Sequence, residues 1–235
     1  MRASKIQTKN IVYFAILLAL VVVLQVVSNY ITFGPVSITL VLIPIVVGGI
    51  LLGPLAGALL GLSFGIITII GSLKSPLFVT APALIIILAL VKATAAGFFP
   101  ALFYKLIAKK HPVIATYVAS ASAPIINTGI FILGCIAGIT KLKEAFGIDE
   151  TGAAIVFVFV GIVGINFFIE FGINILLTPA VIKIIDIVKG KIREKKAVQE
   201  IEDDEEEQTE VIEENSENIG EGNYEQEERQ DSSNE

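Results

Sequence analysis

Several residue types are scarce or missing, and each absence excludes a kind of site. The 235 residues include one cysteine, one histidine and no tryptophan. A single cysteine, Cys135, excludes an intramolecular disulfide and a multi-cysteine metal site. The single histidine, His111, lies at the edge of a basic turn, so no HExxH zinc motif can form. The lack of tryptophan disfavours a pocket built on indole stacking, although 14 phenylalanines offer other rings.

Acidic residues are equally scarce in the apolar part of the chain. No aspartate lies inside an apolar run, since Asp186 falls at the edge of the last one. This argues against an intramembrane aspartyl protease and an aspartate-rich prenyl transferase. No glycine-rich loop ends in Gly-Lys-Ser/Thr, so the chain does not hydrolyse ATP by a P-loop mechanism. We predict that the protein is not an enzyme, and nothing in the sequence calls for a cofactor or a metal.

Apolar residues are abundant instead. They make up 54% of the chain, and the mean hydropathy is +0.79. A water-soluble domain cannot bury that much apolar surface, so lipid must be the solvent for most of it. Six apolar runs are separated by short polar or Gly/Pro-containing segments. They cover residues 11–27, 37–52, 55–70, 82–107, 113–137 and 153–185. We therefore predict an all-α membrane protein, a compact bundle of six transmembrane helices.

The basic residues near the ends of these runs predict the orientation in the cell membrane. Lys and Arg accumulate on the cytoplasmic side of membrane proteins. A cytoplasmic N-terminus puts twelve of them inside and three outside: Arg2, Lys5, Lys9, Lys105, Lys109, Lys110, Lys183, Lys189, Lys191, Arg193, Lys195 and Lys196 against Lys74, Lys141 and Lys143. Both termini are then cytoplasmic. The same bias accounts for the basic residues without nucleic-acid binding.

Charge divides the chain into two parts. Residues 1–193 carry 14 Lys/Arg and 5 Asp/Glu, whereas residues 194–235 carry 3 and 18. The second segment has too few apolar residues to offset the entropy of ordering, so we expect a disordered acidic cytoplasmic tail. The domain boundary is predicted at residue 193.

Five polar residues inside the apolar runs are candidates for a binding site. Lys92 and Glu170 are the two charges well within a run, and Asn127, Asn166 and Asn174 add amides. Charges inside a membrane are costly and mark a site or a pair. The spacing of four in Asn166, Glu170 and Asn174 predicts one polar stripe on a helix. At about 1.5 Å rise per residue, Lys92, Asn127 and Asn166 all lie roughly 15–20 Å below the outer surface.

Different functions fit this polar layer. It can form a pocket for a small solute, in which Lys92 meets an anionic group. Alternatively, Lys92 and Glu170 neutralise each other and the amides tie the helices together. An ion-coupled secondary transporter or channel could use the same pair for proton coupling, but the chain has no convincing inverted repeat or pair of broken helices. A scaffold subunit without a ligand would tolerate loss of the polar layer.

Several segments together resemble a known family. Ala15 and Ala19, spaced to allow close helix approach, begin the resemblance. The stretch from Ser37 to Pro44 continues to Gly53-Pro54, Gly57 and Gly61. With six short-looped helices, these segments make residues 10–190 similar to the substrate-binding (S) component of an energy-coupling factor (ECF) transporter. The segments 124–129 and 166–170 look like those of the pantothenate-type branch.

The resemblance implies a function and partners. Such a subunit captures a vitamin or related micronutrient near the outer face and delivers it through one membrane coupling subunit and two ATPases. Ala15 and Ala19 would touch the coupling subunit, loops 29–36 and 71–81 would cap the pocket, and the last three helices would line it. Pantothenate suits the predicted polar layer, with Lys92 on its carboxylate. Riboflavin, another vitamin or a modified base remain alternatives.

Overall fold

Helices make up nearly all of the chain that the structure describes. The structure is a computed structural model, and it describes residues 2–30, 32–33, 36–37, 40–164 and 166–190. The predicted tail, 194–235, and the predicted boundary at residue 193 lie outside this part. The elements are α1 (Arg2–Tyr30), β1 (Thr32–Phe33), β2 (Val36–Ser37), α2 (Leu42–Leu52), α3 (Pro54–Ser72), α4 (Pro76–Thr80), α5 (Pro82–Ile107), α6 (Pro112–Ala137), α7 (Ile139–Phe146), α8 (Thr151–Val156), the π-helical η1 (Phe157–Val163) and a helix over residues 166–190.

The predicted all-α membrane fold is confirmed. Within the described residues, five spans are long and apolar enough to cross a membrane: Lys9–Ser28, Pro54–Ser72, Pro82–Ile107, Pro112–Ala137 and Thr151–Gly190. The remaining apolar run, 37–52, contributes the shorter α2, which has 11 residues. At about 1.5 Å per residue α2 is too short to cross the hydrocarbon core alone.

The predicted start of the second helix was wrong. Ser37 lies in β2, which pairs antiparallel with β1 in the register Thr32 to Ser37, and α2 begins only at Leu42. Pro44 explains the difference. Proline has no backbone N–H, so it fits the first turn of a helix but interrupts one that has already begun.

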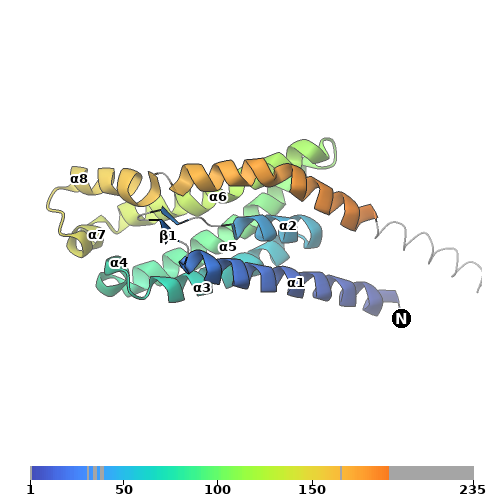
Figure 1. The fold of residues 1–235 in the computed structure, drawn as a ribbon, viewed down its shortest axis with the longest axis horizontal. Coiled ribbons are helices and arrows are strands. Elements are labelled where there is room, and N and C mark those ends of the chain that lie inside the picture. Colours follow the sequence, from blue (N-terminus) through green and yellow to red (C-terminus); the bar gives the residue numbers. More distant parts are fainter. Residues whose placement is uncertain (1, 31, 34–35, 38–39, 165, 191–235) are drawn as a thin grey trace, which may run out of the picture. The chain divides into compact units, whose positions relative to one another are not determined.

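The two segments that carry the lysines predicted to lie outside, Lys74 in one and Lys141 and Lys143 in the other, contain short helices. α4 lies in the first, residues 71–80, and α7 lies in the second, residues 138–152. α4 packs on α7, and α7 packs on α8. Figure 1 shows these three helices at the end of the bundle opposite the N-terminus. The connections between the long helices therefore form a packed layer of their own.

The last membrane span is not one continuous α-helix. The α-helical turns of α8 pass into the wider π-helical η1, and the α-helix resumes at residue 166. The local sequence, Val-Phe-Val-Phe-Val-Gly-Ile-Val-Gly over 156–164, is rich in β-branched residues and glycine, which are weak helix formers. π-Helical turns are frequently found at functional sites.

Two apolar clusters make up the core of residues 1–185, which form one compact unit. The first joins buried residues of α1, α2, α3, α5, α6 and the last helix, including Val21, Leu42, Leu60, Ala119 and Val181. The second joins α4, α7, α8 and η1 to the neighbouring ends of α5 and α6, with Leu142 and Val158 at its centre. The two clusters leave room for polar side chains between them.

α3 and α5 make the most extensive helix contact. Gly57, Gly61 and Gly65 follow one face of α3 at a spacing of four and meet Gly97, Ala93 and Ala89 of α5. A Cβ atom added to Gly57 would overlap the carbonyl oxygen of Gly97, and one added to Gly61 would overlap that of Ala93. Small residues at this spacing let two membrane helices approach backbone to backbone.

Because of this contact, we expect alanine substitution to destabilise the protein at Gly57 but not at a glycine with open space around it. Gly57→Ala should lower the free energy of unfolding in detergent by about 1–3 kcal/mol, because the added methyl group forces the two backbones apart. Gly172→Ala in the last helix is the matched control, since no atom lies within 4 Å of its added Cβ. Thermal unfolding of both variants measures the difference. Equal unfolding temperatures would show that the close contact is not required.

Candidate functional site

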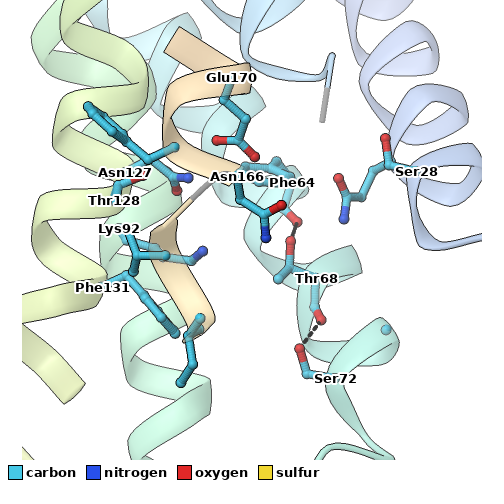
Figure 2. Close-up of a pocket in the computed structure, with 15 residues that line it drawn as sticks. Ser28, Phe64, Thr68, Ser72, Lys92, Asn127, Thr128, Phe131, Asn166 and Glu170 are labelled. Carbon is cyan, nitrogen blue, oxygen red and sulfur yellow. Dashed lines mark hydrogen bonds between the residues drawn. The ribbon is translucent and has the colours of Figure 1, made fainter. Parts of the chain in front are cut away.

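A cavity of about 350 Å³ lies among the long helices. α1, α3, α5, α6, η1 and the last helix all contribute to its wall, and Figure 2 shows the side chains converging on it. The lining residues are Gln25, Ser28, Phe64, Thr68, Gly71, Ser72, Lys92, Asn127, Thr128, Phe131, Ile162, Val163, Asn166, Phe167 and Glu170. The apolar members belong to both core clusters: Phe64 to the first, and Phe131, Ile162 and Val163 to the second. The cavity therefore lies between the two clusters.

The two intramembrane charges both line this cavity. Lys92 extends from α5, and its Nζ lies 5.1 Å from the centre of the Phe131 ring on α6. A cation above an aromatic face is attracted by the ring, with an energy of about 0.5–2 kcal/mol that rises as water is excluded. Glu170 on the last helix is buried, and its negative charge acts on the Lys92 ammonium. The Lys92 side chain therefore lies over a ring from α6 and within the electrostatic influence of an acid from the last helix.

Two of the predicted amides lie in the same wall. Asn127 is 7% exposed, and no described residue donates a hydrogen bond to its Oδ1 atom. A buried acceptor without a donor costs about 1–3 kcal/mol, so this atom favours a ligand with a donor group. Asn166 also lines the cavity, one helical turn before Glu170. Lys92, Asn127, Asn166 and Glu170 are thus brought together from three helices, as the polar layer predicted.

The sequence analysis missed most of a second polar wall, of which only Ser72 lies in a segment expected at the pocket, the cap over residues 71–81. Gln25 and Ser28 come from α1, and Thr68 and Ser72 come from α3. The expectation that the last three helices line the pocket was therefore incomplete. Of these four, Gln25 gave a signal in the sequence, because an amide inside an apolar membrane run is costly unless it faces a partner or a cavity. Serine and threonine gave none, since their hydroxyls commonly bond to the backbone of their own helix.

Asn174 is not among the lining residues. It is 2% exposed, and its Nδ2 donates a hydrogen bond of 2.8 Å to the backbone oxygen of Glu170. One turn further on, Thr178 donates to the backbone oxygen of Asn174 in the same way. The predicted stripe thus continues below the cavity as bonds within one helix. A contact of Asn174 with substrate stays a prediction.

The predicted partner surface and caps can be located in part. Ala15 and Ala19 are both exposed on α1. The buried residues in the described part of this helix are Val21, Gln25 and Ser28, so α1 turns one stripe inward and leaves its alanines on the outside. From the predicted cap over residues 71–81, Gly71 and Ser72 line the cavity. The side chains of the other predicted cap, residues 29–36, lie outside the described residues.

The composition of the wall indicates the kind of molecule that fits. Ligand pockets measure about 300–1,000 Å³ and are mostly apolar, with a few polar groups that fix orientation. This cavity is at the small end of that range, and nine of its 15 lining residues are polar or charged. Phe64, Phe131 and Phe167 provide the aromatic surface. In the described part of the chain, no three His, Cys, Asp or Glu side chains are grouped as metal ligands would be. The cavity suits a small polar solute.

Comparison with known proteins gives the family. Residues 9–182 match the family described as "ECF transporter, substrate-specific component". No curated protein and no solved structure matches the chain. The match spans most of the 235 residues, including every residue that lines the cavity. The chain belongs to the family of substrate-specific components of ECF transporters, membrane subunits that bind a small-molecule substrate and associate with an energy-coupling module.

Proposed function

We propose that this subunit captures a small carboxylate-bearing micronutrient in the cavity around Lys92, with pantothenate as the best candidate. The observation that carries the proposal is the ammonium group of Lys92 in a small, mainly polar cavity. A carboxylate is the natural counterpart of a cation that is largely removed from water, because a charge-assisted hydrogen bond is about twice as strong as a neutral one. The amides of Asn127 and Asn166 would then meet the hydroxyl and amide groups of the substrate.

The size of the cavity favours pantothenate over larger candidates. A volume of about 350 Å³ suits a slender, flexible molecule better than the broad ring system of riboflavin. Polar groups on several helices also fit a substrate that is polar along its whole length. Binding to Asn174 would require the substrate to reach past Glu170.

Delivery across the membrane is proposed to depend on partner subunits. The chain carries no P-loop motif, so ATP hydrolysis would take place on two ATPase subunits and would be transmitted by a membrane coupling subunit. We further propose that Ala15 and Ala19 contact that coupling subunit, because both are exposed and small residues four apart allow close helix packing. Both termini would face the cytoplasm and the cavity would load from outside.

Calorimetric titration of the purified chain tests the substrate. Pantothenate should bind the isolated protein, and Lys92→Ala should weaken binding by about 2 kcal/mol or more, roughly thirtyfold, because the carboxylate loses its partner. Lys105→Ala is the control, since it removes an exposed positive charge from the same helix outside the cavity. Unchanged affinity in Lys92→Ala would remove this lysine from the site, and no binding to any water-soluble vitamin would contradict the proposal.

A double variant separates the two interpretations of the charge pair. If Lys92 only neutralises Glu170, the double exchange Lys92→Met and Glu170→Gln should bind like the wild type, because removing both partners leaves no isolated charge. If Lys92 holds the substrate, binding should stay lost in the double variant. The same titration distinguishes these results.

Cysteine labelling tests the orientation. In a Cys135→Ala background, Lys141→Cys should react with a membrane-impermeant maleimide on intact cells, and Lys109→Cys should react only after permeabilisation. Both lysines are exposed, so accessibility depends on the side of the membrane. The reverse pattern would place the termini outside.

Association with the coupling subunit tests the exposed alanines. The double exchange Ala15→Leu and Ala19→Leu should reduce copurification with the coexpressed coupling subunit by about tenfold, because larger side chains hold two helices apart. Substrate binding by the isolated chain should remain at the wild-type level. Val23→Leu is the control, an exposed residue of the same helix whose side chain is already large. Undiminished copurification would place the contact elsewhere.

A further inference from the structure

Two hydroxyl groups in the cavity wall have already used their only proton. Thr68 donates its hydroxyl hydrogen to the backbone oxygen of Phe64 at 2.9 Å, and Ser72 donates to that of Thr68 at 2.8 Å. Figure 2 shows both bonds running along α3 beside the cavity. A hydroxyl has one donor and two acceptor lone pairs. Toward the cavity, these two oxygens can therefore only accept.

Acceptors also face the cavity from the other helices. The buried Oδ1 of Asn127 receives no hydrogen bond from a described residue, and the carboxylate of Glu170, when ionised, accepts only. Acceptor groups therefore line the cavity from three helices: α3, α6 and the last helix. A hydrogen-bond donor of the ligand would satisfy the Oδ1 atom of Asn127.

The cation and the hydroxyl pair stand on different sides of the site. Lys92 and Phe131 extend from α5 and α6, whereas Thr68 and Ser72 extend from α3, and Figure 2 draws the two sets across the cavity from each other. A ligand that places a carboxylate on Lys92 would turn its uncharged end toward α3. That end would lie against acceptors.

We propose that the hydroxyls of Thr68 and Ser72, the acceptor pair, select substrates whose uncharged end carries O–H or N–H donors. This inference rests on the proposed function for the carboxylate end and adds a requirement at the other end. It defines the substrate class as a small carboxylate with at least two neutral donors distant from its charge. Carboxylates with an apolar tail are excluded, because their binding would leave the acceptor pair buried without donors.

For a carboxylate with an apolar tail, the binding free energy lost at the acceptor pair would exceed the free energy gained from apolar contacts. A site built to hydrogen-bond a substrate hydroxyl discriminates strongly against an analogue that lacks it, because the polar groups of the site are left unpaired. An apolar tail of similar size would gain only the aromatic contacts with Phe64 and Phe167. The acceptor pair therefore acts as a determinant of specificity.

Variants of the intact chain test the acceptor pair by calorimetry. Thr68→Val keeps the shape of the side chain and removes the oxygen, and Ser72→Ala removes the second one. Each should weaken pantothenate binding by about tenfold, the loss expected for one hydrogen bond of roughly 1.4 kcal/mol. A pantothenate analogue that lacks the hydroxyl bound by the exchanged residue has no donor to lose. The exchange should therefore leave the affinity for that analogue unchanged.

The control comes from the same helix. Ser63 also bonds to the backbone one turn earlier, at 3.0 Å to the oxygen of Leu59, but it does not line the cavity. Ser63→Ala therefore removes the same kind of helix bond and should leave the affinity unchanged. Losses in Thr68→Val and Ser72→Ala no larger than in this control would overturn the inference.

A donor-free carboxylate supplies the second measurement. Octanoate should bind the wild type far more weakly than pantothenate does. In Thr68→Val, the difference in affinity between the two carboxylates should be smaller. Octanoate binding as tightly as pantothenate would overturn the inference while leaving the role of Lys92 intact. If the wild type binds neither pantothenate nor any other carboxylate among the water-soluble vitamins, the proposed function fails. The inference that rests on it then fails as well.

Discussion

The backbone contact between α3 and α5 is the constraint on which the cavity depends. Gly57, Gly61 and Gly65 let α3 lie directly on Gly97, Ala93 and Ala89 of α5. Ala93 is the neighbour of Lys92, so the same contact that joins the helices fixes where Lys92 leaves α5. Thr68 and Ser72 continue along α3 beyond the glycines and reach the cavity from the other side. A wider separation of α3 and α5 would change the distance between the Lys92 ammonium and the acceptor pair.

Lipid solvation explains why this cavity can be polar. In a bilayer the helices gain little from burying apolar surface against one another, so association depends on close packing and on hydrogen bonds. Several polar side chains within the membrane helices, such as Gln25, Asn127 and Glu170, are accordingly buried. α1 shows the pattern most clearly: most of its residues are exposed, and its inward stripe ends in Gln25 and Ser28 at the cavity.

The sequence predicted the helices and the charged half of the site because both leave strong signals. Long apolar runs identify membrane helices, and Lys92 or Glu170 inside such a run is visible without any structure. The start of α2 and the π-helical η1 depend on local backbone geometry. Pro44 near the first, and the glycines and β-branched residues around the second, are weak signals that do not specify that geometry. Thr68 could not be predicted either, since its position in the chain does not say which face of α3 turns inward, whereas Ser72 falls in the segment 71–81 that was expected to cap the pocket.

The polar groups of the cavity wall also bear on how the subunit would bind its substrate. Asn127 keeps a buried acceptor without a donor from the described residues, and Lys92 lies over the Phe131 ring and within the electrostatic influence of Glu170. The unpaired Asn127 acceptor costs free energy that a donor group of the proposed substrate would recover, and its carboxylate would add a further partner for Lys92. The polar groups are already held by helices on several sides, so little ordering accompanies binding. Under the proposed function, this preorganisation would favour tight binding, because the cost of removing the polar groups from water is met when the helices assemble.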